Sequence, residues 1–384
     1  MKNRSFVPAW FSLLALAIPA VLMAQDAAPV VTPSPARWYK GNTHTHTINT
    51  DGDSSPVDVV RFYREQGYNF VVLSDHDSIT PTEGLNALFG TAESNATDRT
   101  ALPFRPFMVI PGEEVTDAFI PEVSAGQDPS TRDLGRKEIH LIGVGVKTVV
   151  PRQKGMSPSD VLQRNVDAIR AASGLPIINH PNFVWSLTAD DLKPLRGAPL
   201  VEIWNGHMQT NNLGGGDRPS VEAMWDQVLS AGTLMYGVAA DDAHFFKTPP
   251  LPAAPSAPGR AFVMVRSDRF TMDAIMAALE RGDFYASTGV ELAEYAVTSR
   301  AVTLKVKVLQ QSRYHVSFIG RGGKVLNDVW VTPTLPKGAT SLGAARLADA
   351  VTYEWKGDEG YVRAKIVDSN GLMAWTQPVL VPGR

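Results

Sequence analysis

From Trp38 to Gly289 the sequence repeats one pattern, in which a short apolar run ends in a polar tip and a helical segment follows. The seven runs are "RWYKGNTHTH", "NFVVLSDHD", "FMVIPGEE", "EIHLIGVGV", "LPIINHP", "PLVEIWNGH" and "LMYGVAADDAH". This alternation is typical of βα units in a parallel sheet. Because the carboxyl ends of the strands of a parallel barrel meet at one mouth, we predict an α/β barrel over residues 37–297 whose polar tips lie together.

Helical segments between the runs carry recognisable start signals, such as Ser157 followed by Pro158. In the segment that follows Ser220, the apolar residues recur at the spacing of one helix face, and Gly232 ends the pattern. We assign these apolar residues to the core: Val221, Met224, Trp225, Val228 and Leu229.

The pattern changes after Arg300, where "VTLKVKVL" alternates apolar and polar residues at the strand period of two. The later segment "YVRAKIVDSNGLMAWTQPVLV" is typical of a hairpin with Asn370 and Gly371 in its turn. We therefore predict a small antiparallel β domain, similar to a β-sandwich, over residues 298–384. Its histidine, His315, is expected to be a surface or packing residue.

The composition limits the chemistry and the partners of the chain. It has no cysteine, which excludes disulfides, thiolate metal sites and a cysteine nucleophile. Acidic residues outnumber basic ones, 39 to 36, although the part after Ser299 is basic, with 12 Lys and Arg against 6 Asp and Glu. The preceding α/β part is therefore acidic, which argues against a nucleic-acid-binding face and favours a small-molecule substrate. The sequence leaves the oligomeric state open.

The N-terminus is typical of an export signal. In residues 1–24, Lys2 and Arg4 precede an apolar run that ends at Ala24, and a Pro- and Ala-rich linker is predicted over residues 25–36. We therefore expect a periplasmic or secreted protein with no stable membrane insertion after cleavage. Leu22 stands where a small residue normally precedes the cut, and the apolar run is nearly long enough to span a bilayer, so an uncleaved anchor is the alternative.

Seven of the eight histidines lie in the polar tips, beside carboxylates. In chain order the tips contain His44, His46 and Asp51; Asp75, His76 and Asp77; Glu113 and Glu114; His140; His180; Glu202, Asn205 and His207; and Asp241, Asp242 and His244. His and carboxylate ligands suit Zn, Mn or Fe, and about nine of them are too many for one ion. We predict two to three divalent ions and hydrolysis by a hydroxide that bridges them, with no protein nucleophile.

The tips also resemble a known family. The motifs "THTHTINTDGD", "VVLSDHDSI", "PGEEV", "IHLIG", "INHPN" and "ADDAHF" are similar, in order, to those of the polymerase and histidinol phosphatase (PHP) family of metal-dependent phosphoesterases. "RGDFYASTG" and the small β domain resemble the exported branch that includes carbaryl-hydrolase-like metallohydrolases. The resemblance covers roughly residues 38–290 and implies a distorted seven-stranded (β/α) barrel, commonly with three metals.

The resemblance also implies a ligand set. It assigns the first metal to His44, His46, Glu114 and Asp242; the second to Glu114, His140 and His180; and the third to Asp51, His76 and His244. Family members often have His where Asp51 stands, which leaves the third metal open.

Other tip residues are candidates for supporting roles. His207 is the one tip histidine outside the ligand set, so it is a candidate proton donor to the leaving group, with a hydrogen-bonded rim residue as the alternative. Asp75 is a candidate catalytic residue that orients His76, as is Asp77, and the alternative for both is a turn cap. Three basic residues are candidate phosphate contacts: Arg61, Lys137 and Arg260.

These features lead to one functional hypothesis and two alternatives. The leading hypothesis is an exported hydrolase of small phosphomonoesters or phosphodiesters. A carbamate, amide or ester hydrolase with the same metal site is the first alternative, because the same hydroxide can attack a carbonyl carbon. A non-catalytic metal- or ligand-binding module is the second.

Overall fold

We describe a computed structural model of the chain, which covers residues 36–91, 105–121, 135–247, 255–309, 312–334 and 348–381. The predicted signal sequence and all but the last residue of the predicted linker lie outside the described residues. Within the described part of the chain, no helix combines the length and the apolar character needed to cross a bilayer.

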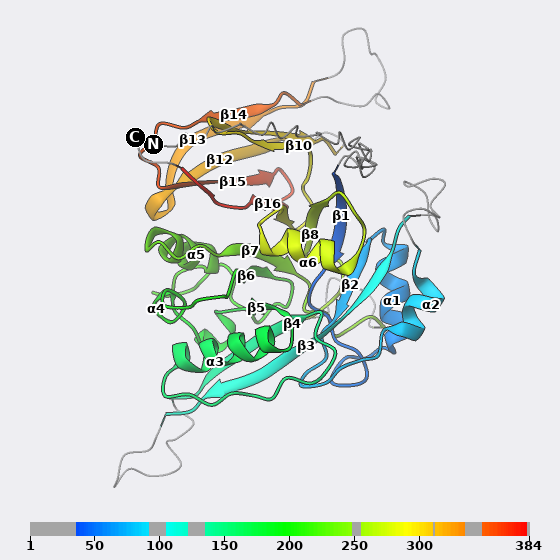
Figure 1. Ribbon diagram of the computed structural model, residues 1–384. Helices are drawn as coiled ribbons and strands as arrows, with labels where there is room; N and C mark the ends of the chain where they lie inside the picture. The colour runs from blue at the N-terminus through cyan, green and yellow to red at the C-terminus, as the bar shows by residue number, and fades with distance from the viewer. Residues whose placement is uncertain are drawn as a thin grey trace, which may run out of the picture. The chain divides into compact units, whose positions relative to one another are not determined.

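Seven strands follow one another in the sheet in sequence order, as the repeating pattern predicts (Figure 1). They are β1 (Arg37–Asn42), β2 (Phe70–Leu73), β3 (Met108–Phe119), β4 (Lys137–Val144), β5 (Leu175–Ile178), β6 (Leu200–Asn205) and β7 (Tyr236–Ala240). Four of the six pairings between neighbours are parallel, but β4 is antiparallel to both β3 and β5. The expectation of seven parallel strands is therefore wrong for β4. A parallel return needs a crossover, usually a helix, and residues 120–136 between β3 and β4 have no helical periodicity.

The predicted closed barrel is not confirmed, because the described residues show an open sheet, with no ladder between β7 and β1. The segments just after these two strands do meet in an isolated parallel bridge between Thr45 and Ala243. Alternate side chains from each of β1 to β8 also share one buried cluster, which includes Tyr39, Ile110 and Val238. The sheet thus curves around a common core, and the tips of its first and last βα strands are tied together.

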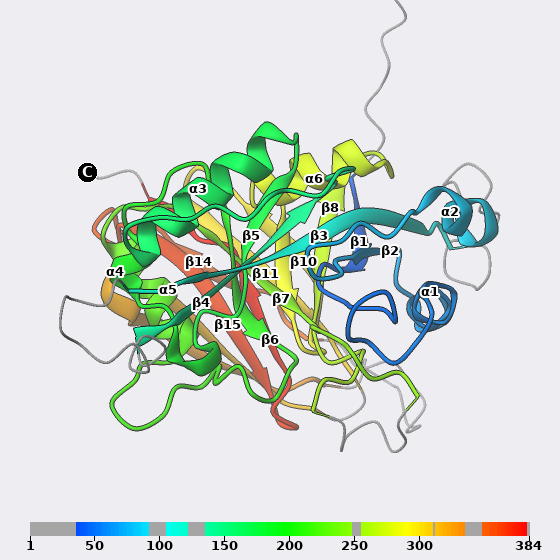
Figure 2. The ribbon, with the colours of Figure 1, turned by 90° about the horizontal axis from the view of Figure 1, so that it is seen from below.

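The helices begin where polar caps and prolines predict. They are α1 (Pro56–Glu65), α2 (Glu83–Phe89), α3 (Pro158–Ala171), α4 (Ala189–Leu192), α5 (Val221–Ser230) and α6 (Met272–Glu280), with short 3₁₀ turns η3 (Phe183–Trp185) and η5 (Arg321–Gly323). Ser55, Ser157 and Ser220 each accept a backbone N–H in the first turn of α1, α3 and α5. The apolar stripe of α5 is buried, as predicted. Figures 1 and 2 show α1 and α2 side by side next to β2 and β3.

The later strands extend the same sheet. After β8 (Phe262–Ser267) and β9 (Phe284–Ser287) come β16 (Met373–Thr376), β15 (Tyr361–Asp368), β12 (Tyr314–Gly320) and β13 (Lys324–Val331), with β17 (Val379–Leu380) beside β15. These pairings are antiparallel, as the alternation after Arg300 predicts. A second sheet contains β10 (Glu291–Val297), β11 (Ala301–Lys307) and β14 (Val351–Glu354). The domain boundary at 297/298 stays a prediction, and the large sheet runs across it through the pairing of β9 with β16.

A buried ion-pair cluster joins α5 to β15. The Arg363 guanidinium, 1% exposed, donates to both carboxylate oxygens of Asp226 at 2.9 and 2.6 Å and lies 2.9 Å from Glu222 Oε1. The Tyr361 hydroxyl donates to Asp226 at 2.7 Å, and the guanidinium lies over the Trp225 ring. Such a cluster fixes the relative position of two elements, because removing one partner leaves the other charge buried and unpaired.

Candidate metal centre

The first histidine pair lies just beyond β1, where the backbone is tied to the tip of β7. The His46 N–H donates to Ala243 O, and the Asp242 N–H donates to His44 O. The two imidazoles point the same way, as alternate residues of an extended segment do, and their Nε2 atoms are 3.1 Å apart. Both side chains are fully buried.

Four buried candidate ligand atoms lie close together beyond the strand ends. Five of their separations are 3.1–3.3 Å, and the atoms are His44 Nε2, His46 Nε2, Glu114 Oε2 and Asp242 Oδ1. Neighbouring ligand atoms around one Zn²⁺ lie about this far apart when each is about 2.0 Å from the ion, the bond length of Zn²⁺ to His nitrogen and carboxylate oxygen. His44, His46 and Asp242 are therefore close enough together to ligate one divalent ion, and Glu114 Oε2 lies 3.3 Å from both histidine nitrogens.

A second group uses the other oxygen of the Glu114 carboxylate. Glu114 Oε1 lies 3.2 Å from His140 Nδ1 and 3.2 Å from His180 Nε2, and it accepts a hydrogen bond from Asn179 Nδ2 at 2.8 Å. The reversed direction of β4 places His140 here, because the start of an antiparallel strand lies at the same edge as the ends of its neighbours. The carboxylate of Glu114 thus faces two candidate sites at once, as a bridging ligand does.

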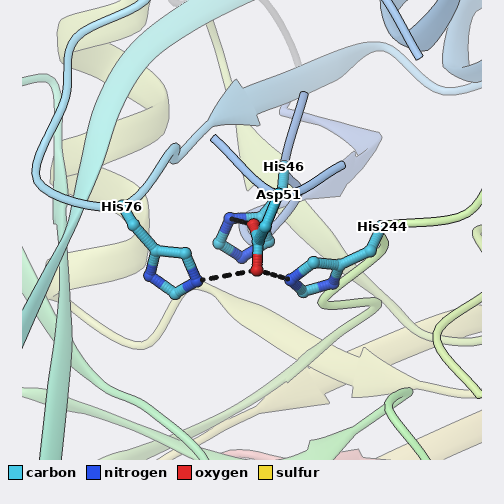
Figure 3. Close-up of side chains that lie close together, drawn as sticks. All are labelled: His46, Asp51, His76 and His244. Atoms are coloured by element: carbon cyan, nitrogen blue, oxygen red, sulfur yellow. Dashed lines mark ion pairs between the residues drawn. The ribbon is translucent and has the colours of Figure 1, made fainter. Parts of the chain in front are cut away.

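The third group consists of Asp51, His76 and His244, which Figure 3 shows together with His46. Asp51 Oδ2 is 3.4 Å from His76 Nε2 and 3.3 Å from His244 Nε2, while Asp51 Oδ1 is 3.7 Å from His46 Nδ1. The Asp51 side chain is 53% exposed, whereas the ligands of the first group are buried. Burial alone would raise the pKa of Asp51, but hydrogen bonds from His244 and His76 lower it.

The electrostatics of the centre favour a cation. Although burial opposes a charge on His44, the neighbouring carboxylates raise the pKa of its imidazole well above the ordinary value. Although burial likewise opposes the charge on Glu114, the surrounding imidazoles hold its pKa well below the ordinary value. An excess of buried carboxylate around imidazole nitrogens is compensated either by protons or by metal ions.

Two of the candidate ligands have a strained backbone. His180 has φ 22° and Asp242 has φ 51°, in a region that residues other than glycine rarely adopt. Strain of this kind persists only where the surroundings enforce it, and it is concentrated at functional sites. The fold therefore holds both side chains in conformations that local preference does not supply.

Two polar residues at the tip of β6 orient the ligands, a role that sequence reasoning did not give them. Glu202, fully buried, accepts the Nδ1–H of His44 at 2.8 Å and the backbone N–H of His180 at 2.8 Å. Asn205 donates through Nδ2 to Glu202 at 2.9 Å and to Asp242 at 3.1 Å. With its Nδ1 proton held in this way, His44 presents the lone pair of Nε2 to the centre.

Asp75 supports the loop rather than His76. Its carboxylate accepts hydrogen bonds from the Thr47 backbone N–H and from the hydroxyls of Thr47, Thr50 and Thr80. None of the described hydrogen bonds of Asp75 goes to His76, whose Nδ1 instead lies 2.6 Å from Thr116 Oγ1. Asp77 accepts from the Thr116 N–H, so it supports this partner of His76 from the neighbouring strand.

His207 lies beside the centre but outside the three ligand groups. Its ring centroid is 5.8 Å from that of His244, and its Nδ1 accepts the Gln209 N–H at 3.2 Å. Burial lowers the pKa of His207 below the ordinary value. In the neutral ring the hydrogen is therefore on Nε2.

The three candidate phosphate contacts have separate surroundings. Arg61 pairs with Asp58 on exposed α1, and Lys137 donates to Trp185 O at 3.4 Å. Arg260 donates to Gly206 O and lines a cavity together with His207. Of these three, Arg260 is therefore the one in the same cavity as His207.

Comparisons with known proteins give distant structural similarity. No family model matches the chain, and the curated proteins include no match. A two-domain protein from Bacteroides vulgatus that contains a predicted PHP-like metal-dependent phosphoesterase is 13% identical, with a TM-score of 0.46, over 90% of this chain and 96% of that chain. An amidohydrolase from Chromobacterium violaceum is 14% identical, with a TM-score of 0.32, over 54% of this chain and 88% of that chain. We base the functional assignment on the geometry of the site.

Proposed function

We propose that the chain is a metal-dependent hydrolase of small phosphomonoesters or phosphodiesters. The observation that carries this proposal is the buried cluster of His44, His46, Glu114 and Asp242, in which five separations between ligand atoms are 3.1–3.3 Å. Structural histidines seldom place ring nitrogens this close to one another and to two carboxylates, whereas metal ligands do.

The residues of the chain have distinct tasks in this proposal. Bound divalent ions would polarise the ester oxygen and lower the pKa of a water molecule that attacks the phosphorus. Glu114 would hold two ions through its two oxygens, and Glu202 keeps His44 in the tautomer that ligates. His207 would offer its Nε2 hydrogen to the leaving-group oxygen, because its Nδ1 is already an acceptor.

A carbamate or carboxylic ester hydrolase is the second candidate. Of the three basic side chains considered for phosphate, only Arg260 shares a cavity with His207. A carbamate or carboxylic ester needs no such side chain, because a bound divalent ion can itself polarise the carbonyl oxygen.

Two measurements test the proposal. Elemental analysis of protein purified without chelator should find two to three transition metals per chain, and a value below one would refute a multinuclear centre. Zn- and Mn-loaded protein should then be screened against aryl phosphates, aryl phosphodiesters and aryl carbamates. His44→Ala and Glu114→Ala should abolish turnover, whereas the control His315→Ala should not, because His315 on β12 pairs with Asp328 on β13 and lies outside the three ligand groups.

We also propose that the chain is exported. The support is the charged start, the apolar run and the small residue Ala24 at its end. Mass spectrometry of protein expressed from the full sequence in a bacterium should find a mature N-terminus at Gln25 in the periplasm or medium. An intact Met1 in the membrane fraction would support the uncleaved anchor instead.

A further inference from the structure

An apolar cavity of about 760 Å³ lies beside the metal centre. Its apolar side chains are Trp204, Met208, Leu213, Leu372 and Met373. The first three belong to β6 and the loop after it, whereas Leu372 and Met373 come from the turn and strand after β15. The cavity is therefore built from two distant parts of the chain.

The cavity shares its wall with the metal centre. Asn205 and His207 both line it. Asn205 Nδ2 is 3.1 Å from Asp242 Oδ2, and the His207 ring is 5.8 Å from the ring of His244. A substrate whose reacting bond lies at the metals can therefore extend directly into this cavity.

The walls are held in place by contacts of their own. The Trp204 ring stacks on the Trp375 ring, with centroids 5.7 Å apart. Asp368 accepts the Leu372 N–H at 2.9 Å, which fixes the turn before β16. Gly289 lies so close to Leu372 that a Cβ there would come within 2.7 Å of Leu372 Cδ1. The cavity is thus pre-formed, as small-molecule sites usually are.

Two apolar side chains at the cavity are largely exposed. Met208 is 68% exposed and Leu213 is 75% exposed. Apolar side chains that gather around a concave surface mark a ligand site more often than scattered ones do. Methionine also adapts its shape to different apolar ligands.

We propose that this cavity binds an aromatic or bulky alkyl group of the substrate, on the leaving-group side of the bond that is broken. The proposal rests on the proposed hydrolase function, because it places the reacting bond at the metal centre. Leu372 and Met373 then make the C-terminal strands part of the substrate site. The preferred substrates are esters with a large apolar alcohol, rather than small polar phosphates.

A binding experiment tests the cavity without turnover. Isothermal titration of the full-length protein with 1-naphthol, both metal-loaded and chelator-treated, should show one site. Met208→Asp should weaken binding about tenfold or more, because a charge in an apolar wall opposes an apolar ligand. The matched control is Met156→Asp, which changes a methionine that is 78% exposed and lies outside the cavity, and it should bind as the wild type does. Absence of binding, or equal binding by Met208→Asp, would overturn the proposal.

A substrate pair then links the cavity to catalysis. 2-Phenylethyl phosphate and ethyl phosphate release primary alcohols of similar acidity, so their rates differ mainly through binding of the alcohol. The wild type should favour the phenylethyl ester in kcat/KM by about tenfold or more, and Met208→Asp should lower kcat/KM for the phenylethyl ester more than for the ethyl ester, so that the preference is lost. Equal rates for both esters would refute the substrate preference. If neither ester is hydrolysed while 1-naphthol still binds, the phosphomonoesterase function fails and the cavity assignment stands.

Discussion

Replacing Glu202 by Gln tests whether the hydrogen bonds behind the ligands control metal binding. Oε2 of Glu202 accepts two N–H groups, from His180 and Asn205, while Oε1 accepts the Nδ1–H of His44. The amide oxygen of a glutamine will take the position with two donors. Its NH₂ group then faces His44 Nδ1, which must become an acceptor, so the His44 hydrogen moves to Nε2, the ligating atom.

The substituted protein must therefore reverse this tautomer, or lose a hydrogen bond, each time it binds metal. Loss of such an orienting partner typically lowers metal affinity about 10- to 100-fold, which corresponds to about 1.4–2.7 kcal/mol. Competition with a chromophoric chelator for Zn²⁺ measures this change directly. Thermal unfolding of the metal-free protein, followed in parallel, shows that the variant is folded.

Glu113→Gln is the matched control for this substitution. Glu113 is also buried on the sheet, but its described hydrogen bond comes from the Val150 N–H and not from a ligand. Burial raises the pKa of Glu113 to about 7, so its site already disfavours the charged form and tolerates a neutral amide. The metal affinity of the Glu113→Gln variant should match that of the wild type. If Glu202→Gln binds Zn²⁺ within about twofold of the wild type, the orienting role is wrong.

Three further predictions follow from other contacts. Asp226→Ala should lower the free energy of unfolding by about 2 kcal/mol or more in urea denaturation, because it removes two charge-assisted hydrogen bonds from the buried Arg363 and leaves it the ion pair with Glu222. Asp190→Ala, at a surface pair, should cost less than about 1 kcal/mol. His207→Ala should slow the hydrolysis of esters with poor leaving groups about a hundredfold and that of nitrophenyl esters much less, while the metal content stays unchanged. An equal loss of rate on both classes of ester would indicate a structural role. Asp51→Ala should reduce the metal content by about one ion per chain and leave the buried ions bound. If elemental analysis finds an unchanged metal content, the third group does not hold a metal ion.

Much of the candidate site was predictable because strand ends carry the ligands. The structure brings all nine predicted ligand residues into three adjoining groups, and the alternation of apolar run and polar tip had already placed them at one edge. His140 carried a signal that was not used. His140 stands near the start of its apolar run, whereas His44, His46, His180 and His244 stand at or near the ends of theirs. A strand of reversed direction explains this difference.

Other features depend on contacts that no local pattern reveals. Glu202 and Asn205 were visible at the sixth tip, but their roles come from hydrogen bonds to residues 22 to 158 positions away. Asp75 adjoins His76 in sequence, yet its partners are threonine hydroxyls on the loop, because a buried carboxylate takes whichever donors the packing supplies. The pairing of β9 with β16 joins segments about ninety residues apart in the sequence. The apolar periodicity of a strand does not predict which distant strand it pairs with.

The pairing of β9 with β16 has a consequence for any attempt to shorten the protein. A chain that stops at Val297 lacks β16, so β9 becomes the last strand of the sheet, with its backbone N–H and C=O groups exposed along an apolar edge. An uncovered edge of this kind invites pairing with another chain and aggregation. The truncated chain also lacks Leu372 and Met373 and keeps only part of the cavity beside the metals. A fragment that keeps the whole cavity must therefore include the C-terminal strands, even though every candidate metal ligand precedes them.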